Sequence, residues 1–176
     1  MAALVKALGE LKQPVVLLAP TGRAAKVLAR YANKPAYTIH KYIYRQDKLG
    51  TDSFSLSDNL HKHTLFIVDE ASMIDSALMC ALLKAIKPGA RLIIIGDADQ
   101  LPSVGPGNVL NDLIASEKMP VVCLTEIFRQ AQQSLIVTNA HDINEGKMPV
   151  LNEKKNDFFF LERNNAEDIR QLLLSL

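Results

Sequence analysis

The sequence lacks the features that anchor a chain in a membrane, export it or staple it together. No apolar run approaches the roughly 20 residues that a membrane-spanning helix needs. The N-terminus has neither the long apolar segment nor the small-residue cleavage site of a secretory signal, so we expect a cytoplasmic protein with no membrane partner. The two cysteines, Cys80 and Cys123, have apolar neighbours and no metal-ligand spacing, and we expect both to be reduced and buried.

An excess of charge of one sign is also missing, because 20 basic residues stand against 19 acidic ones and give a net charge of +1. The overall charge therefore gives no reason to expect a nucleic-acid partner, and any such contact must be local. Glycine and proline are infrequent, at eight each, and 48% of the 176 residues are hydrophobic. This balance excludes a disordered or fibrous chain and is typical of one soluble domain.

The sequence also has no phosphate-binding loop of the form G-x-x-x-x-G-K-S/T. Its only Gly-Lys pair, Gly146-Lys147, is followed by Met148 instead of Ser or Thr. The glycine-rich cradle that wraps the phosphates of a nucleotide is therefore missing from these 176 residues.

Four short apolar runs, rich in Val and Ile, predict buried strands. They are Val15–Ala19, Leu65–Val68, Leu92–Ile95 and Val121–Leu124. Helical patterns occupy the first 14 residues, Gly22–Tyr31, Ser76–Ile86, Pro106–Ala115 and Ala166–Leu174. Because strands alternate with helices, we expect an α/β fold in which helices cover both faces of a parallel sheet. The polar stretch Gln46–Asn59 is either a surface excursion or the stub of a small subdomain.

The run Leu65–Val68 leads directly into two carboxylates, Asp69 and Glu70. Ligands of parallel sheets bind beyond the carboxyl ends of the strands. An Asp at that place can hold Mg²⁺ on a bound nucleotide, and the adjacent Glu can deprotonate a water that attacks the γ-phosphate. This is the Walker B arrangement. A strand that ends in a solvated acidic turn is the alternative that the motif alone leaves open.

The next run is followed by a Gly-Asp turn and Gln100. A neutral amide at a strand end can sense a γ-phosphate by hydrogen bonding, although an exposed amide in a turn is the alternative. Farther along the chain, Gly105–Asn108 forms a glycine turn. We expect Pro106 to open a helix there and to leave backbone amides free for a phosphate.

Two other strand ends carry residues suited to phosphate chemistry. After the first run, the Thr21 hydroxyl, the amides near Gly22 and the Arg23 guanidinium can contact a nucleic-acid phosphate. An ordinary helix cap with a surface arginine is the alternative reading of this segment. Arg129, after the last run, can stabilise charge on a transferring phosphoryl group or serve as a structural ion-pair partner.

In their order and spacing, these motifs resemble the first motor domain of superfamily 1 helicases, and especially the RecD-like group of exodeoxyribonuclease V alpha subunits. The resemblance runs from about residue 15 to residue 160, through APTGRAAKVL, TIHKYI, FIVDEASMID, IIIGDADQLPSVGPGNVLNDL and LTEIFRQ. It implies a three-layer RecA-like P-loop NTPase core, a parallel sheet flanked by helices. In that family the P-loop precedes the helix before the APTGRAA segment, so we expect this chain to start just after it.

The resemblance also implies roles for single residues. Asp69 is expected to coordinate Mg²⁺ and Glu70 to act as the general base, with ATP as the nucleotide. Gln100 is expected to sense the γ-phosphate, and Arg129 to contact the nucleotide. The residues expected to contact single-stranded DNA are Pro20, Thr21, Gly22 and Arg23, with His40, Gly105 and Asn108 as weaker candidates. For His40, a packed or hydrogen-bonded histidine at a helix start is the alternative.

These roles lead to an expectation for the whole chain. Residues 1–145 are expected to form a partial motor domain, and residues 146–176 a connector toward a second motor domain. The implied function is ATP-driven translocation on single-stranded DNA, generally 5′ to 3′, in recombination and repair. Other exodeoxyribonuclease V subunits are candidate partners. Because the P-loop and the second motor domain are missing, we expect the isolated chain to lack ATPase activity.

Two other functions remain open at this point. A degenerate helicase-like domain could bind single-stranded DNA or a protein without hydrolysis, which fits the missing P-loop. It gives no reason for Asp69, Glu70, Gln100 and Arg129 to stand together at strand ends. A different α/β enzyme could use the two carboxylates for another metal-dependent reaction, but it leaves Gln100 and Arg129 unexplained.

Overall fold

The chain divides into two compact units, which are described separately. A computed structural model describes residues 2–46, 54–56, 64–124, 134–151, 153 and 157–175. Unit 1 comprises Met1–Val121 and unit 2 comprises Val122–Leu176. No helix in these described ranges is long and apolar enough to cross a membrane.

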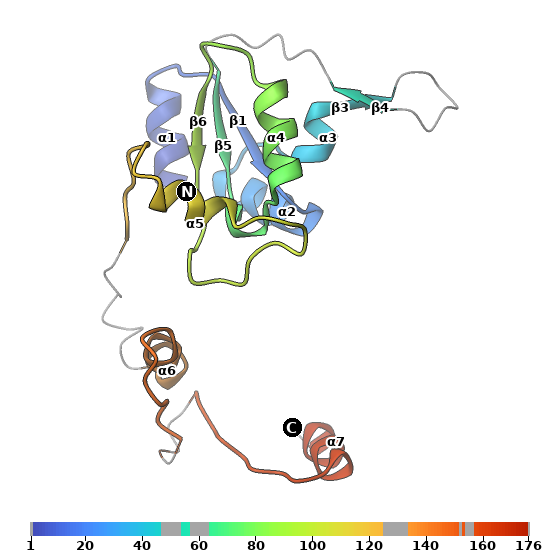
Figure 1. Cartoon of the computed structure of the whole chain (residues 1–176), viewed down its shortest axis with the longest axis vertical. Coiled ribbons are helices and arrows are strands. Elements are labelled where there is room, and N and C mark those ends of the chain that lie inside the picture. The colour runs from blue at the N-terminus through green and yellow to red at the C-terminus, as the bar shows by residue number, and fades with distance from the viewer. Residues whose placement is uncertain are drawn as a thin grey trace. The chain divides into compact units, whose positions relative to one another are not determined.

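A parallel sheet of four strands forms the centre of unit 1 (Figure 1). The strands are β1 (Val15–Ala19), β2 (Ala36–Thr38), β5 (Leu65–Val68) and β6 (Arg91–Ile94), in the order β2-β1-β5-β6. Ile67 of β5 lies opposite Leu17 of β1 and opposite Ile93 of β6. All four residues of β5 are buried, whereas β6 ends the sheet and is only partly buried. The predicted parallel sheet is therefore confirmed.

Helices cover both faces of this sheet. Those on one face are α1 (Ala2–Glu10) and α2 (Gly22–Ala32), and those on the other are α3 (Ile39–Ile43), α4 (Ser76–Ala85) and α5 (Val109–Ala115). Leu17 and Ile67 pack with Leu28 of α2, while Leu18 and Phe66, on the opposite face, pack with α3 and α4. Neighbouring residues of a strand point to opposite faces, so continuous apolar runs supply both layers. The three-layer α/β fold is confirmed.

The polar stretch between the first and second halves of the sheet carries a small hairpin. Strands β3 (Tyr44–Gln46) and β4 (Phe54–Leu56) pair antiparallel and form a separate two-stranded sheet beside α3 (Figure 1). Of the stretch Gln46–Asn59, only Gln46 and Phe54–Leu56 are described, and they belong to this hairpin.

One predicted strand and the predicted start of one helix are wrong. Val121–Leu124 forms no strand, because these residues pair with none of the strands described and their side chains are exposed, Leu124 at 96%. An apolar run becomes a strand only where a neighbouring strand takes up its hydrogen bonds. Pro106 does not open a helix, since α5 begins at Val109 and Asn108 is its N-cap residue.

The prediction that both cysteines are buried is also wrong, since Cys80 and Cys123 are exposed. In α4, the buried residues Met79 and Leu82 face the sheet. Cys80 follows Met79 by one position, a rotation of about 100° around the helix, which turns its side chain outward. Cys123 belongs to the exposed segment that forms no strand.

Unit 2 is built around helix α6 (Leu135–Asn144), with α7 (Ala166–Ser175) as its second helix. The buried side chain of Asn139 makes two hydrogen bonds with the backbone of Val150, accepting from its N–H at 2.8 Å and donating to its carbonyl at 3.1 Å. Asp157 accepts a hydrogen bond from the N–H of Leu135 at the start of α6. These contacts fasten the segment after α6 back onto the helix.

Candidate functional site

The carboxyl ends of β1, β5 and β6 meet at one edge of the sheet. Hydrogen bonds at this edge continue beyond the strands, from Asp69 N–H to the Leu18 carbonyl at 3.0 Å and from Ile95 N–H to the Val68 carbonyl at 2.8 Å. Because the three strands are parallel, the residues that follow them are neighbours in space. We call this region the strand-end edge: residues 20–23, 69–72 and 96–100.

Asp69 and Glu70 lie in the middle of the strand-end edge, directly after the central strand β5. Both side chains are half-buried, and Asp69 Oδ1 accepts the backbone N–H of Glu70 at 3.1 Å. Glu70 has a φ of 54° and a ψ of 43°, in the left-handed region that residues other than glycine rarely adopt. Such backbone strain persists where surrounding structure enforces it, and it is concentrated at functional sites.

The backbone at Gly96 crosses close to the turn η1 (Ala71–Met73) that follows Glu70. Ala71 N–H donates to the Ile95 carbonyl at 3.0 Å. A Cβ atom on Gly96 would lie 2.8 Å from the Leu110 side chain and 3.1 Å from the Ser72 nitrogen. The Ser72 hydroxyl is buried and has no hydrogen-bond partner among the described residues. A side chain at position 96 would therefore displace Leu110 and press on the backbone of η1, so glycine allows the close approach of the two segments.

Gln100 lies on the exposed turn that continues from β6. Its side-chain amide donates to Asp97 Oδ2 at 3.4 Å, while Asp97 Oδ1 accepts the N–H of Asp99 at 3.0 Å. Asp97 thus holds both the turn and the Gln100 side chain. The sequence predicted the Gly-Asp turn but not the hydrogen bond between Gln100 and Asp97. Such a bond has no sequence signature beyond the three-residue spacing.

The loop after Gln100 packs against the start of α4. A Cβ on Gly105 would collide with the Asp75 carboxylate, and one on Gly107, whose φ is 105°, would collide with the Ser76 hydroxyl. The Asn108 side chain makes no helix cap, and its Oδ1 instead accepts a hydrogen bond from the Asn111 side-chain amide at 3.1 Å. Close packing in the loop therefore accounts for both glycines.

The segment after β1 forms the first turn of α2. Thr21 is the N-cap, and its hydroxyl oxygen accepts the N–H of Ala24 at 3.2 Å. This is the helix cap that the sequence left as an alternative, and it leaves the Arg23 side chain exposed to solvent. Gly22 has open space on the side where a Cβ would stand, and Pro20 is half-buried.

His40 follows the carboxyl end of β2, so it belongs to the same end of the sheet. Thr38, paired in register with Ala19, caps α3 by accepting the N–H of Lys41 at 3.2 Å. The His40 side chain is exposed, and its ring stacks on that of Tyr44 with centroids 6.1 Å apart. The structure therefore brings Asp69, Glu70, Gln100 and the α2 and α3 starts to one end of the sheet, while Arg129 lies outside the described residues.

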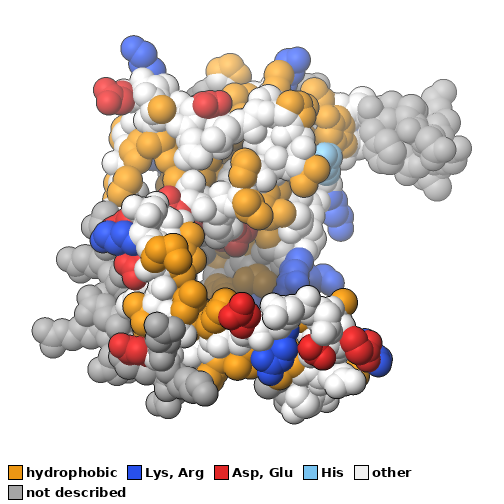
Figure 2. Space-filling view, turned by 60° about the horizontal axis from the view of Figure 1, so that its bottom comes forward, with side chains coloured by type: hydrophobic (Ala, Val, Ile, Leu, Met, Phe, Trp, Pro, Cys, Tyr) orange, Lys and Arg blue, Asp and Glu red, His pale blue; other side chains and the backbone are white. Residues whose placement is uncertain are grey.

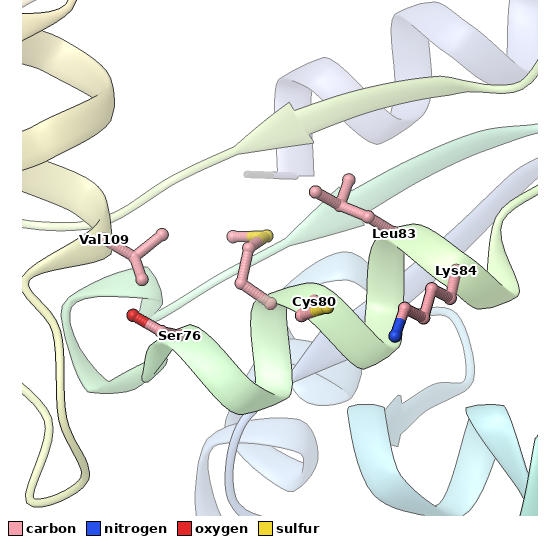
Figure 3. A pocket seen from close by; sticks show the side chains of 6 residues that line it. Ser76, Cys80, Leu83, Lys84 and Val109 are labelled. Atoms are coloured by element: carbon pink, nitrogen blue, oxygen red, sulfur yellow. The ribbon is translucent and has the colours of Figure 1, made fainter.

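A hollow in unit 1 lies away from the strand-end edge, between α4 and α5 (Figure 3). It has a volume of about 460 Å³ and is open and mostly apolar. Its lining residues are Ser76, Met79, Cys80, Leu83, Lys84 and Val109. None of the candidate site residues lines it, and its apolar surface does not suit phosphate groups. Among the described residues, no group of three or more His, Cys, Asp or Glu side chains is placed to hold a metal ion by itself.

Residues 1–162 match a protein family described as AAA domain. The ATP-dependent RecD2 DNA helicase of Deinococcus radiodurans is 37% identical over 147 residues, which cover 80% of this chain and 19% of that protein. The RecBCD enzyme subunit RecD of Mycobacterium tuberculosis is 37% identical over 129 residues, covering 60% of this chain and 21% of that protein. The chain therefore spans about a fifth of the length of these relatives.

A solved structure of Pif1 helicase from Bacteroides, in complex with ADP-AlF3 and ssDNA, is also similar. The matched region covers 93% of this chain and 47% of the Pif1 chain, with 18% sequence identity and a TM-score of 0.46.

Proposed function

The chain belongs to the AAA domain family and to its RecD-like helicases, and from this premise we propose that it forms part of an ATP-dependent DNA helicase. Its strand-end edge would contribute one carboxylate that binds magnesium and one that activates water. It would also contact single-stranded DNA. The observation that carries the proposal is the meeting of Asp69, Glu70 and Gln100 at the carboxyl ends of adjacent parallel strands. Unrelated surface turns have no reason to gather these three side chains.

The donor set at the strand-end edge fits Mg²⁺ bound to a nucleotide. Magnesium takes oxygen ligands and often binds proteins through only one or two carboxylates, with water and phosphates completing its coordination. Asp69 offers such a carboxylate, because Oδ1 is oriented by the Glu70 amide and Oδ2 bonds to no other described residue. When bound, the ion would neutralise charge on the phosphates. Asp69 would hold it.

Glu70, Gln100 and Arg129 would complete the chemistry. Glu70, half-buried beside Asp69, would serve as the base that takes a proton from water. Gln100 would exchange its bond with Asp97 for one with the γ-phosphate. Arg129 would supply positive charge at the nucleotide.

The DNA contact would run along the starts of α2 and α3. Pro20, Thr21, Gly22 and Arg23 would meet the phosphate backbone, with His40, Gly105 and Asn108 beside them. Arg23 and His40 are exposed and follow neighbouring strands, which supports this assignment. The finer expectations also remain proposals: movement 5′ to 3′, action in the cytoplasm, other exodeoxyribonuclease V subunits as partners, and residues 146–176 as a connector after a motor domain of residues 1–145.

Phosphate release tests the proposal. The product of the longest open reading frame that contains this chain is expected to hydrolyse ATP faster when single-stranded DNA is added. Glu70→Gln should lower that rate by about a hundredfold or more, since it removes a general base. The 176-residue chain alone is expected to release no phosphate. Turnover by the isolated chain that Glu70→Gln abolishes would contradict this expectation, and an ATP-independent long product would contradict the helicase proposal.

A non-catalytic binding module is the second candidate. One observation favours it, namely that these residues contain no G-x-x-x-x-G-K-S/T loop. In that case the long product would bind an oligonucleotide in a salt-dependent way, because phosphate contacts release counterions, and Glu70→Gln would change nothing.

A further inference from the structure

Positive charge is unevenly distributed along this nearly neutral chain. Residues 11–46 contain seven of the 20 Lys and Arg residues and none of the 19 Asp and Glu residues. Because the whole chain has a net charge of +1, the rest of it carries −6. The acid-free segment includes all of β1, α2, β2 and α3. Figure 2 shows Lys and Arg side chains gathered near a histidine on the face in view.

Helix α2 arranges three of these charges in one row. Arg23, Lys26 and Arg30 are three and four positions apart, so they share one face of the helix, and all three are exposed. The residues of α2 that are buried against the sheet are Ala25, Leu28 and Ala32. The three charges, which we call the α2 stripe, therefore point away from the core.

Local structure does not account for the α2 stripe. None of its three side chains has a hydrogen bond or an ion pair with another described residue. The helix dipole favours Arg30 in the last turn of α2, but it disfavours Arg23 in the first turn, where acidic residues are stabilising. These three cations have no partner among the described residues, and the first of them is disfavoured by the helix dipole. Such a row is typical of a binding surface.

The row matches the spacing of phosphates on a nucleic-acid strand. From Arg23 to Arg30 the helix rises by about 10 Å, at about 1.5 Å per residue. A strand stacked as in a duplex rises about 3.4 Å per nucleotide, so the α2 stripe spans about three nucleotides of a stacked strand. Its first residue, Arg23, belongs to the strand-end edge, and the other two continue from there along the outside of α2.

Two uncharged side chains beside the stripe indicate which form of nucleic acid it suits. Tyr31 is 69% exposed and Val27 is 48% exposed, and both lie on the same outer side of α2. An exposed aromatic ring next to cations is a platform on which an unpaired base can stack, whereas the bases of a duplex are already stacked. The surface therefore favours a single strand.

We propose that the α2 stripe, with Tyr31 beside it, binds about three further nucleotides of single-stranded DNA as the strand leaves the strand-end edge. This inference rests on the proposed function, because it takes Arg23 as the start of the path. It adds Lys26, Arg30 and Tyr31 as contacts and gives the strand a direction across the outside of the domain.

Salt-dependent binding of oligothymidylates to the full 176-residue chain tests the proposal. A strand of about 15 nucleotides can occupy both the edge and the stripe, and one of about 6 can occupy the edge alone. With the longer strand, the double variant Lys26→Gln, Arg30→Gln should bind more weakly and lower the slope of log K against log salt by about 1.4, because two phosphate contacts are lost. With the shorter strand, binding should equal that of the parent chain.

Matched variants test whether the position of the charges matters, or only their number. Lys84→Gln, Lys118→Gln removes two exposed charges elsewhere in unit 1 and should change neither strand's binding. Tyr31→Leu should weaken the longer strand about fivefold or more, and Tyr31→Phe should restore it, since a phenyl ring still stacks. Gln is a good helix former, so thermal melting of the stripe variant should match that of the parent.

Each other outcome decides something. Equal slopes for the stripe variant and the parent overturn this inference and leave the proposed function standing. If the stripe variant binds the longer strand more weakly but Arg23→Gln does not, the stripe binds DNA and the edge does not. This result contradicts the DNA contact of the proposed function. If the parent binds no oligothymidylate, this inference and the DNA contact assigned to the strand-end edge are both overturned. If the stripe variant loses as much affinity for a DNA duplex or for poly-glutamate as for the single strand, the single-strand assignment is overturned.

Discussion

The backbone N–H of Ser76 donates a hydrogen bond to the carbonyl oxygen of Pro106 over 3.0 Å. This bond ties the start of α4, which follows the carboxylates, to the loop that follows Gln100. Ser103 strengthens the loop from within, because its hydroxyl lies 3.0 Å from the Gly105 carbonyl and 3.2 Å from that of Gly107. The loop and α4 are thus expected to move as one body.

Replacing Gly107 should loosen this junction. Gly107→Ala adds a methyl group against the Ser76 hydroxyl at a φ of 105°, and should lower the free energy of unfolding by about 1–3 kcal/mol. Chemical denaturation of the parent and the variant measures the difference. Gly89→Ala is the matched control, since Gly89 has a φ of 93° but open space around it, and it should be milder.

A second variant isolates the contact with Ser76. Adding Ser76→Ala to Gly107→Ala removes the hydroxyl that the new methyl group meets, so the double variant should be more stable than the sum of the single effects predicts. Strict additivity would mean that backbone strain alone, and not this contact, requires glycine at position 107.

The protein should be more stable with glycine at position 70 than with a residue that has a Cβ atom. The left-handed backbone there costs about 1 kcal/mol for any residue with a Cβ, so Glu70→Gly should melt at a higher temperature than Glu70→Ala. Thermal unfolding of the two variants measures this difference without regard to activity. If the alanine variant is equally stable, the backbone at position 70 carries no strain.

Asn139 should be required for the order of unit 2. Asn139→Ala leaves the N–H and carbonyl of Val150 without their partner and should destabilise the unit by about 2 kcal/mol. Hydrogen exchange at the Val150 amide reports the loss directly. Asn144→Ala, at the exposed end of the same helix, should leave that amide protected.

Acid should release the cap at the start of α6. Hydrogen bonds from the Ser134 hydroxyl and the Leu135 N–H hold the pKa of Asp157 below its ordinary value. The stabilisation is therefore complete above the ordinary Asp pKa of about 3.9 and is lost as the pH falls through the lower pKa of the folded protein. The amide shift of Leu135 should follow this titration in NMR spectra, and Asp157→Asn should abolish it.

The sequence predicted the parts of this molecule that depend on local pattern. The buried runs Val15–Ala19 and Leu65–Val68 have the bounds of β1 and β5, because a strand covered on both faces must be apolar throughout. The neighbourhood of Asp69 and Gln100 followed from the geometry of parallel strands alone. What these residues would bind came from the resemblance to a family.

Features that depend on distant contacts could not be predicted. The amide of Asn139 meets Val150 eleven positions later, and nothing in either residue's surroundings marks the pair. The close crossing of Gly96 over the turn that follows Glu70 joins segments 26 positions apart, and no local pattern marks it. The run Val121–Leu124 misled because apolar residues can also remain at the surface.

Strand β6 has a consequence for the handling of the protein. It stands at the end of the described sheet, and its apolar residues from Leu92 to Ile94 are only half-buried. Backbone groups along such an edge are a template on which another polypeptide can add a strand, and charge protects the edge only at Arg91. The isolated chain should therefore self-associate as its concentration rises.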